Sequence, residues 1–134
     1  MEPPIDILLV DDDPRNLAAL EAILSDRGYR LLRAEDADRA LRMLLDHDVA
    51  AIVLDIQMPS CDGFQVARAF RTSPRLGLVP IIAHTSLAER EIIERGKAAG
   101  IDAYCRKGDS PRVLLRLIAH LAPTGRLGET VHTS

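Results

Sequence analysis

An apolar run that ends in three consecutive aspartates is found in the stretch Ile5-Asp6-Ile7-Leu8-Leu9-Val10-Asp11-Asp12-Asp13-Pro14. Residues 5–10 have the length and apolar character of a strand that is covered on both faces. Asp13 followed by Pro14 is typical of a helix start, because an aspartate caps free N–H groups and proline fits the first helical position. The stretch therefore predicts a buried strand that leads directly into a helix, with acidic side chains at the junction.

The same alternation of strand and helix continues along the chain. Further strand-like segments are residues 29–33, 49–54, 80–84 and 103–106, and segments of helical period are residues 14–27, 36–45, 64–71, 88–99 and 111–121. This alternation predicts an α/β fold, a doubly wound five-stranded parallel sheet with five helices. We expect the apolar segments 5–10, 49–54 and 80–84 in the centre of the sheet, and we expect Leu41, Ile93 and Val113 on buried helix faces.

Composition excludes several classes of protein. The chain has 134 residues, 47% of them hydrophobic, which fits one domain. A formal net charge of −3 disfavours nucleic-acid binding. The apolar run 49–54 is far shorter than the ~20 residues of a membrane span, and the first residues lack the pattern of a signal peptide. We therefore expect a cytoplasmic protein that binds no membrane, and its two cysteines indicate neither a disulfide framework nor a zinc site.

Polar residues follow the predicted strands at their carboxyl ends, which meet at one edge of a parallel sheet. They are Asp11, Asp12, Asp13, Asp55, Thr85, Ser86 and Lys107. Taken singly, each has an ordinary explanation as a helix cap, a turn residue, a satisfied hydroxyl or a solvated cation. Together they place several carboxylates close to one another, and such a cluster favours a shared cation. Carboxylate oxygens suit Mg²⁺, with Mn²⁺ as a substitute.

The same edge can support phosphoryl chemistry. An aspartate beside a divalent cation can act as a nucleophile toward phosphorus, and a phosphoryl group needs positive charge and hydrogen-bond donors around its oxygens. Lys107 and Thr85 would supply that charge and one donor.

Four stretches form one specific pattern: Ile7-Leu8-Leu9-Val10-Asp11-Asp12-Asp13-Pro14, Leu54-Asp55-Ile56-Gln57-Met58-Pro59-Ser60-Cys61-Asp62-Gly63, Pro80-Ile81-Ile82-Ala83-His84-Thr85-Ser86 and Ala103-Tyr104-Cys105-Arg106-Lys107. This pattern resembles the receiver domain of bacterial two-component response regulators, in its single-domain, chemotaxis-regulator-like form. The resemblance implies a flavodoxin-like fold with strand order 2-1-3-4-5. We expect the receiver domain to occupy residues 1–122 and residues 123–134 to form a polar, poorly ordered C-terminal tail.

The resemblance also implies roles for individual residues. Asp55 would be the phosphoacceptor, Asp12 would bind Mg²⁺ directly, Asp11 would orient metal-bound water, and the backbone carbonyl of Gln57 would complete the protein ligands. The phosphoryl-stabilising residues would be Thr85 and Lys107. Tyr104 would be a switch aromatic, although an outer-strand residue of high β propensity is the alternative. Gln57 and Leu87 would tune the hydrolysis rate.

These roles imply a signalling switch with no enzymatic activity beyond self-phosphorylation and self-dephosphorylation. A histidine kinase or a histidine phosphotransfer protein would phosphorylate Asp55. The fourth helix, fifth strand and fifth helix would then dock a downstream target protein, and Leu115 is compatible with a homodimer contact. Since the chain stops soon after the fifth helix, we expect output through protein contacts.

Two other functions remain open at this stage. A degenerate receiver would act as an interaction module without phosphorylation, but the presence of Thr85 and Lys107 disfavours it. A phosphohydrolase of the haloacid dehalogenase type needs a second aspartate two residues after the nucleophile, and Gln57 stands at that position.

The pattern departs from the family after Lys107, where a proline is common and this chain has Gly108. A cis peptide bond before a residue other than proline costs about 2.5 to 4 kcal/mol. We therefore predict a trans bond between Lys107 and Gly108, with glycine adopting the altered turn.

Overall fold

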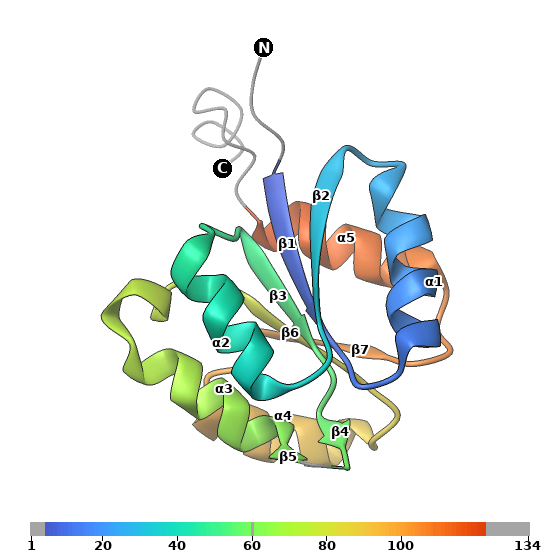
Figure 1. Cartoon of the computed structure of the whole chain (residues 1–134). Helices are drawn as coiled ribbons and strands as arrows, with labels where there is room; N and C mark the ends of the chain where they lie inside the picture. The colour runs from blue at the N-terminus through green and yellow to red at the C-terminus, as the bar shows by residue number, and fades with distance from the viewer. Residues whose placement is uncertain (1–4, 60, 123–134) are drawn as a thin grey trace, which may run out of the picture.

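The computed structural model of the chain describes residues 5–59 and 61–122 and shows a central parallel sheet between helices (Figure 1). The sheet strands are β1 (Ile5–Val10), β2 (Tyr29–Ala34), β3 (Ala51–Leu54), β6 (Ile81–Thr85) and β7 (Ala103–Arg106). Their order is β2-β1-β3-β6-β7, which confirms the expected 2-1-3-4-5 arrangement and the central position of the three most apolar strands. Two short strands, β4 (Gln57–Met58) and β5 (Cys61–Asp62), form a separate antiparallel pair that the sequence analysis did not predict.

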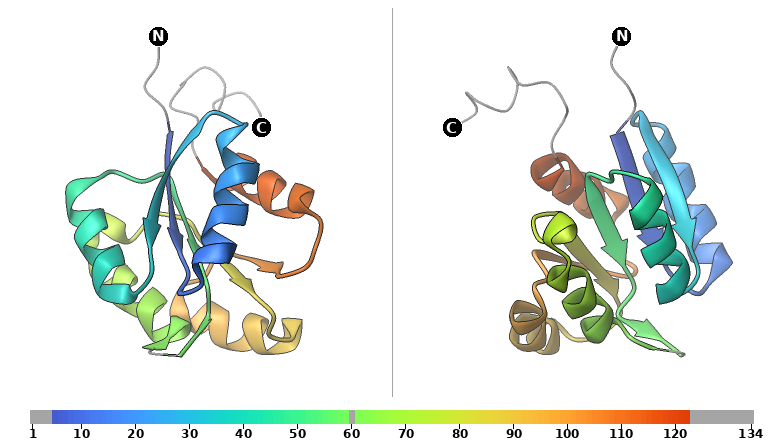
Figure 2. Two further views of the ribbon diagram at one scale, coloured as in Figure 1. Left: turned by 45° about the vertical axis from the view of Figure 1, so that its right-hand side comes forward. Right: turned by 60° about the vertical axis from the view of Figure 1, so that its left-hand side comes forward.

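The helices cover both faces of the sheet, as predicted for a doubly wound fold. They are α1 (Pro14–Ser25), α2 (Ala37–Asp46), α3 (Gly63–Thr72), α4 (Glu89–Ala99) and α5 (Pro111–Leu121), with a 3₁₀ helix η1 (Pro74–Leu76) after α3. Helices α1 and α5 pack on one face, and α2, α3 and α4 pack on the other. The left view of Figure 2 shows α1 and α5 on one side of the sheet and α2 and α3 on the opposite side.

The strands bury side chains on both faces, because each face carries a hydrophobic core of its own. Along β1, Ile7 and Leu9 pack toward α1 and α5, whereas Leu8 and Val10 pack toward α2 and α3. This alternation explains why β1 is apolar at successive positions. The carboxyl end of β1 is therefore held by packing on both faces of the sheet.

Three residues that we expected on buried helix faces are exposed instead. Leu41, Ile93 and Val113 are 38%, 48% and 38% exposed. Each lies one position away from a residue that does pack on the sheet, and these packing residues are Ala40, Ile92 and Leu114. A shift of one residue turns a side chain by about 100° around the helix, which is enough to move it out of the contact.

The predicted tail at 123–134 lies outside the described residues. Within 5–59 and 61–122, no helix has the length and apolar character needed to cross a membrane.

Gly63, the first residue of α3, lies against the backbone that carries Asp55. Its N–H donates to the carbonyl of Ile56 at 3.0 Å. A Cβ atom at this position would collide with the Cα atom of Ile56 and lie 2.9 Å from the carbonyl oxygen of Asp55. The start of α3 is therefore tied sterically to the segment that follows β3.

Gly63→Ala is expected to lower the free energy of unfolding by about 1 to 3 kcal/mol, because the backbone of residues 55 and 56 must shift to admit a methyl group. Chemical denaturation measures this change. Gly77→Ala is the matched control, since Gly77 has a φ of −61° and its nearest atoms are 3.7 Å from an added Cβ. Equal loss of stability in both variants would contradict the steric account.

Candidate functional site

The register of the sheet brings Asp11 and Asp55 side by side. Val10 pairs with Leu54 at the carboxyl ends of β1 and β3, and the N–H of Asp55 donates to the carbonyl of Val10 at 2.8 Å. Asp11 and Asp55 each follow directly after one of these paired residues. Both side chains are only 2% exposed, so two carboxylates are buried together at this edge.

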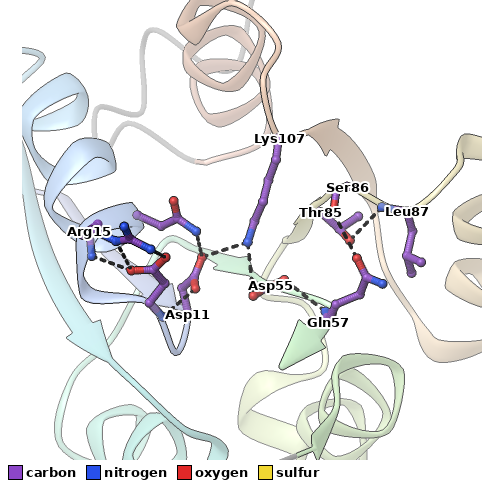
Figure 3. Close-up of polar contacts among 10 residues, drawn as sticks. Asp11, Arg15, Asp55, Gln57, Thr85, Ser86, Leu87 and Lys107 are labelled. Atoms are coloured by element: carbon purple, nitrogen blue, oxygen red, sulfur yellow. Dashed lines mark hydrogen bonds and ion pairs between the residues drawn. The ribbon is translucent and has the colours of Figure 1, made fainter. Parts of the chain in front are cut away.

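Lys107 forms ion pairs with both carboxylates, although it follows β7, two strands away from β3. It follows β7, and its N–H donates to the carbonyl of Thr85 at 2.9 Å. Its Nζ atom lies 3.2 Å from Oδ2 of Asp55 and 3.3 Å from Oδ2 of Asp11 (Figure 3). The long lysine stem therefore spans β6, which lies between β3 and β7.

The turn after Lys107 is formed by Gly108, which stands where the family commonly has a proline. The described residues contain no cis peptide bond, which confirms the trans bond predicted between Lys107 and Gly108. Gly108 has a φ of 96°, a conformation that side chains with a Cβ rarely adopt. Glycine thus supplies the sharp turn at this point.

The pKa values of Asp55 and Lys107 are both raised, for different reasons. Burial, assisted by the charge of Asp11, raises the pKa of Asp55 above its usual value, although the N–H of Gln57 and the ammonium of Lys107 act in the opposite direction. Burial alone would lower the pKa of Lys107, but Asp55 and Asp11 outweigh it and raise that pKa. The ammonium therefore stays charged at neutral pH, whereas ionising the Asp55 carboxyl costs more free energy in the folded protein than in water.

The acidic residues at this edge fit a divalent cation. Asp11, Asp12 and Asp55 each offer an oxygen atom, and these atoms lie within 4.8 Å of one another. Three carboxylates beside one lysine leave two net negative charges, which a divalent cation neutralises. Carboxylate oxygens are ligands that Mg²⁺ prefers.

Asp11 and Asp12 differ in the number of hydrogen bonds and ion pairs that their carboxylate oxygens make. Asp11 accepts hydrogen bonds from the N–H of Asp13 at 2.9 Å and from Nδ2 of Asn16 at 3.3 Å, besides its ion pair with Lys107. Within the described part of the chain, the half-buried Asp12 carboxylate makes no hydrogen bond or ion pair. Asp12 therefore has both oxygens available as direct ligands, and Asp11 does not.

Thr85 and Tyr104 are both hydrogen-bonded to Leu87. The fully buried Thr85 accepts a hydrogen bond on its hydroxyl from the N–H of Leu87 at 3.2 Å. The hydroxyl of Tyr104 donates to the carbonyl of Leu87 at 3.0 Å. Tyr104 is partly buried and packs on the core that also contains α3 and α4. The loop between β6 and α4 is thus attached to the site on one side and to β7 on the other.

Two polar contacts of this site were missed in the sequence analysis. Asn16 holds Oδ2 of Asp11, and Ser86 donates its hydroxyl to Oε1 of Gln57 at 3.1 Å. Asn16 stands in the first turn of α1, so helix geometry placed it near Asp11, but nothing in the pattern marked it as a partner. The family resemblance implied that Ser86, after Thr85, is small so that Asp55 stays accessible, but it implied no contact with Gln57.

Asp55→Asn is expected to raise the free energy of unfolding at neutral pH by about 1 kcal/mol in the absence of divalent cations, or roughly 3 to 5 °C in Tm. The pKa of Asp55 is raised on folding, so its ionised form favours the unfolded chain above that pKa. The gain should shrink as the pH falls through the folded-state pKa, where wild type takes up the proton. Thermal melts in a chelator at several pH values test this. Asp46→Asn, an exposed control on α2, should show no such trend.

Comparison with known proteins agrees with this geometry. A family model described as the response regulator receiver domain matches residues 7–119. A gliding motility regulatory protein of Myxococcus xanthus is 37% identical over 103 residues, which are 77% of this chain and 13% of that protein. The chain therefore spans a small part of that relative's length.

Two solved structures are similar over most of the chain. Chemotaxis protein CheY4 of Vibrio cholerae has a TM-score of 0.84 at 27% identity, covering 89% of this chain and 99% of that one. The receiver domain of the sensor histidine kinase PA1611 from Pseudomonas aeruginosa PAO1 has a TM-score of 0.80 at 32% identity, covering 89% and 98%, and that structure holds a magnesium ion in its active site cleft. The fold, the acidic edge and the family match lead to one conclusion: the chain belongs to the receiver domain family of two-component response regulators.

Proposed function

We propose that this chain is a phosphorylation-controlled switch whose phosphoacceptor is Asp55. The observation that carries the proposal is the meeting of Asp55 with Asp11, Asp12 and Lys107 at the carboxyl edge of the sheet. Receiver domains are signalling domains, and phosphoaspartate and Mg²⁺ are characteristic of the family. In this proposal the receiver domain comprises residues 1–122, followed by a tail at 123–134.

The chemistry is an in-line displacement at phosphorus. A carboxylate oxygen of Asp55 attacks the phosphoryl group of a phosphohistidine on a histidine kinase or a histidine phosphotransfer protein. The bond from phosphorus to nitrogen breaks, and the imidazole leaves with a proton from solvent. Lys107 stabilises the negative charge on the phosphoryl oxygens, and Thr85 donates its hydroxyl to one of them.

Asp12, Asp55 and the backbone carbonyl of Gln57 would hold Mg²⁺, with Asp11 orienting water on the metal. When bound, the cation supplies charge stabilisation for the phosphoryl oxygens. The free oxygens of Asp12 support its assignment as the direct ligand, and the three contacts of Asp11 support its indirect role.

Phosphorylation would reach the protein surface through the loop between β6 and α4. If Thr85 turns toward the phosphoryl group, its hydrogen bond to the N–H of Leu87 is lost, and the Leu87 carbonyl that Tyr104 holds must move with it. Tyr104 borders a pocket of about 190 Å³ with Ile93 of α4. This region, extended by α5, is the face we propose for a target protein or a second copy of the chain.

The two other functions explain the site less well. A degenerate receiver leaves no reason to keep two buried carboxylates, a lysine and a buried threonine together at a cost in stability. A phosphohydrolase of the haloacid dehalogenase type lacks its second acid, because Gln57 cannot exchange a proton in that role.

Acetyl phosphate with Mg²⁺ is expected to add one phosphoryl group to wild type and none to Asp55→Asn, as read by intact mass. Asp46→Asn should gain the group as wild type does, because residue 46 lies at the end of α2, outside the site. Chelation of the divalent cation should abolish the gain. Phosphorylation of Asp55→Asn would show that another residue is the acceptor.

Leu87→Glu is expected to lose its phosphoryl group several-fold faster than wild type, because a carboxylate can orient the attacking water that an apolar side chain obstructs. The measurement is the decay of the phosphorylated mass after the donor is removed. Leu87→Met keeps the apolar character and similar volume, so its decay should match wild type. Equal decay of wild type and Leu87→Glu would refute this role of Leu87.

A further inference from the structure

Arg71, in the last turn of α3, connects three segments of the chain. Its Nη1 atom donates to the carbonyls of Leu76 and Val79, in and after η1, at 2.9 and 2.7 Å. Its Nε atom donates to the carbonyl of Gly100, directly after α4, at 3.0 Å, and its Nη2 atom pairs with Oδ2 of Asp102 at 2.6 Å. Only 19% of the Arg71 side chain is exposed. The planar guanidinium, with its five fixed donors, therefore holds the end of α4 against the end of α3.

The C-terminal end of α4 also has a cap of its own. Gly100 has a φ of 85°, and its N–H donates to the carbonyl of Lys97 at 3.2 Å. The N–H of Ile101 donates to the carbonyl of Gly96 at 2.9 Å, which completes a Schellman motif. A Cβ atom on Gly100 would lie 2.7 Å from Cγ of Arg71. The arginine side chain therefore lies directly against the cap.

Asp102 extends this attachment to the sheet. Its Oδ2 atom accepts the N–H of Ile81, the first residue of β6, at 2.8 Å, besides its ion pair with Arg71. The backbone N–H of Asp102 donates in turn to the carbonyl of Ile81 at 2.9 Å. The C-terminal end of α4 is therefore bound, through Arg71 and Asp102, to α3, η1 and β6.

The N-terminal end of α4 is held less firmly. Its N-cap residue, Ala88, makes no side-chain hydrogen bond to the helix. Leu87, directly before it, is held by the hydrogen bonds to Thr85 and Tyr104, at 3.2 and 3.0 Å. Both of these bonds join neutral groups, whereas the bonds of Arg71 are made by a charged group and are stronger.

A second arginine connects the middle of α4 to α3, which lies beside it (Figure 1), but this connection is at the surface. Nη2 of Arg95 lies 3.1 Å from Oδ2 of Asp62, the N-cap of α3, and the guanidinium lies 4.2 Å from the ring centroid of Phe64. Half of the Arg95 side chain is exposed, and exposed ion pairs are weak. Of these two connections, the firm one is therefore at the C-terminal end of α4.

We propose that Arg71 makes the C-terminal end of α4 a pivot, about which the helix turns while its N-terminal end moves. The 11 residues of α4 span about 16 Å, so a turn of about 10° moves the first residue by about 3 Å. Such a shift breaks the hydrogen bond between Tyr104 and Leu87 and leaves Gly100 in place. The pivot is a property of the fold, and only its use by phosphorylation rests on the proposed function of Asp55.

Hydrogen exchange at single amides, measured by NMR on the unphosphorylated protein, tests the pivot. Tyr104→Phe removes the hydrogen bond to Leu87 and keeps the ring. Exchange at the Leu87 and Ile92 amides should rise roughly two- to tenfold, which is the size of one neutral hydrogen bond. Exchange at the Gly100 and Ile101 amides should stay as in wild type. Amides of β1 report global unfolding, and each rate is compared with theirs.

Arg71→Lys keeps the positive charge but loses the planar fork of donors. It should raise exchange at the Gly100 and Ile101 amides roughly tenfold to a hundredfold relative to β1, because at least one charged hydrogen bond is lost. In this background, Tyr104→Phe should raise exchange at both ends of α4, since the C-terminal end is no longer fixed. Arg68→Lys, at an exposed position of α3, is the matched control and should exchange as wild type.

The outcomes separate the two proposals. The pivot is wrong if Tyr104→Phe alone raises exchange at both ends of α4 equally or at neither, or if Arg71→Lys leaves the Gly100 and Ile101 amides unchanged relative to β1. If acetyl phosphate adds no phosphoryl group to wild type, the proposed function of Asp55 fails, and the measurements on unphosphorylated protein still decide the pivot. If the group is added, changes in exchange should be confined to the N-terminal half of α4 and the loop before it, and an equal change at Gly100 would overturn the pivot.

Discussion

The burial of two neighbouring carboxylates at the end of a parallel sheet is the constraint around which the site is built. The β1–β3 register puts Asp11 and Asp55 side by side, and each is 2% exposed. Like charges this close are unstable without compensation. Lys107 and nearby N–H donors supply part of it, but burial still raises the pKa of Asp55. The remaining negative charge favours the approach of further positive charge to the site.

Lys107 can compensate the negative charge of Asp11 and Asp55 only because its side chain reaches across the sheet. The lysine follows β7, whereas Asp55 follows β3, and β6 lies between them. A short side chain could not cover this distance, since neighbouring strands are about 4.8 Å apart. Gly108, with a φ of 96°, lets the chain turn directly after the lysine. Sheet order, side-chain length and one glycine therefore act together to place a single ammonium group.

The parallel sheet and the gathering of polar residues at one of its edges were predictable from the chain's periodicity, whereas the strand order came only from the resemblance to receiver domains. Parallel strands place their carboxyl ends at one edge, so Asp11, Asp55 and Lys107 were expected at the same edge of the sheet. The exposure of Ile93 was not predictable, because Ile92 and Ile93 are adjacent and both apolar. The sequence pattern alone does not say which of the two faces the sheet. Strands β4 and β5 were not predictable either, because two residues are too few to show an alternation of apolar and polar side chains. The bridge from Ser86 to Gln57 joins positions 29 residues apart and depends on side-chain conformation, which no spacing rule reports.

Three consecutive residues, Thr85, Ser86 and Leu87, lie between Asp55, the proposed phosphoacceptor, and the face that we propose for a target protein. Ser86 is hydrogen-bonded to the side chain of Gln57. The backbone of Leu87 is hydrogen-bonded to the side chains of both Thr85 and Tyr104. In the proposed mechanism, a change at one of these residues would be transmitted to its neighbours, because they share one short backbone segment. Thr85 at the site and Tyr104 at the surface would therefore belong to one conformational equilibrium. Equilibria coupled in this way are reciprocal, so a target that binds better to the phosphorylated arrangement of Leu87 and Tyr104 must also favour phosphorylation of Asp55 to the same extent.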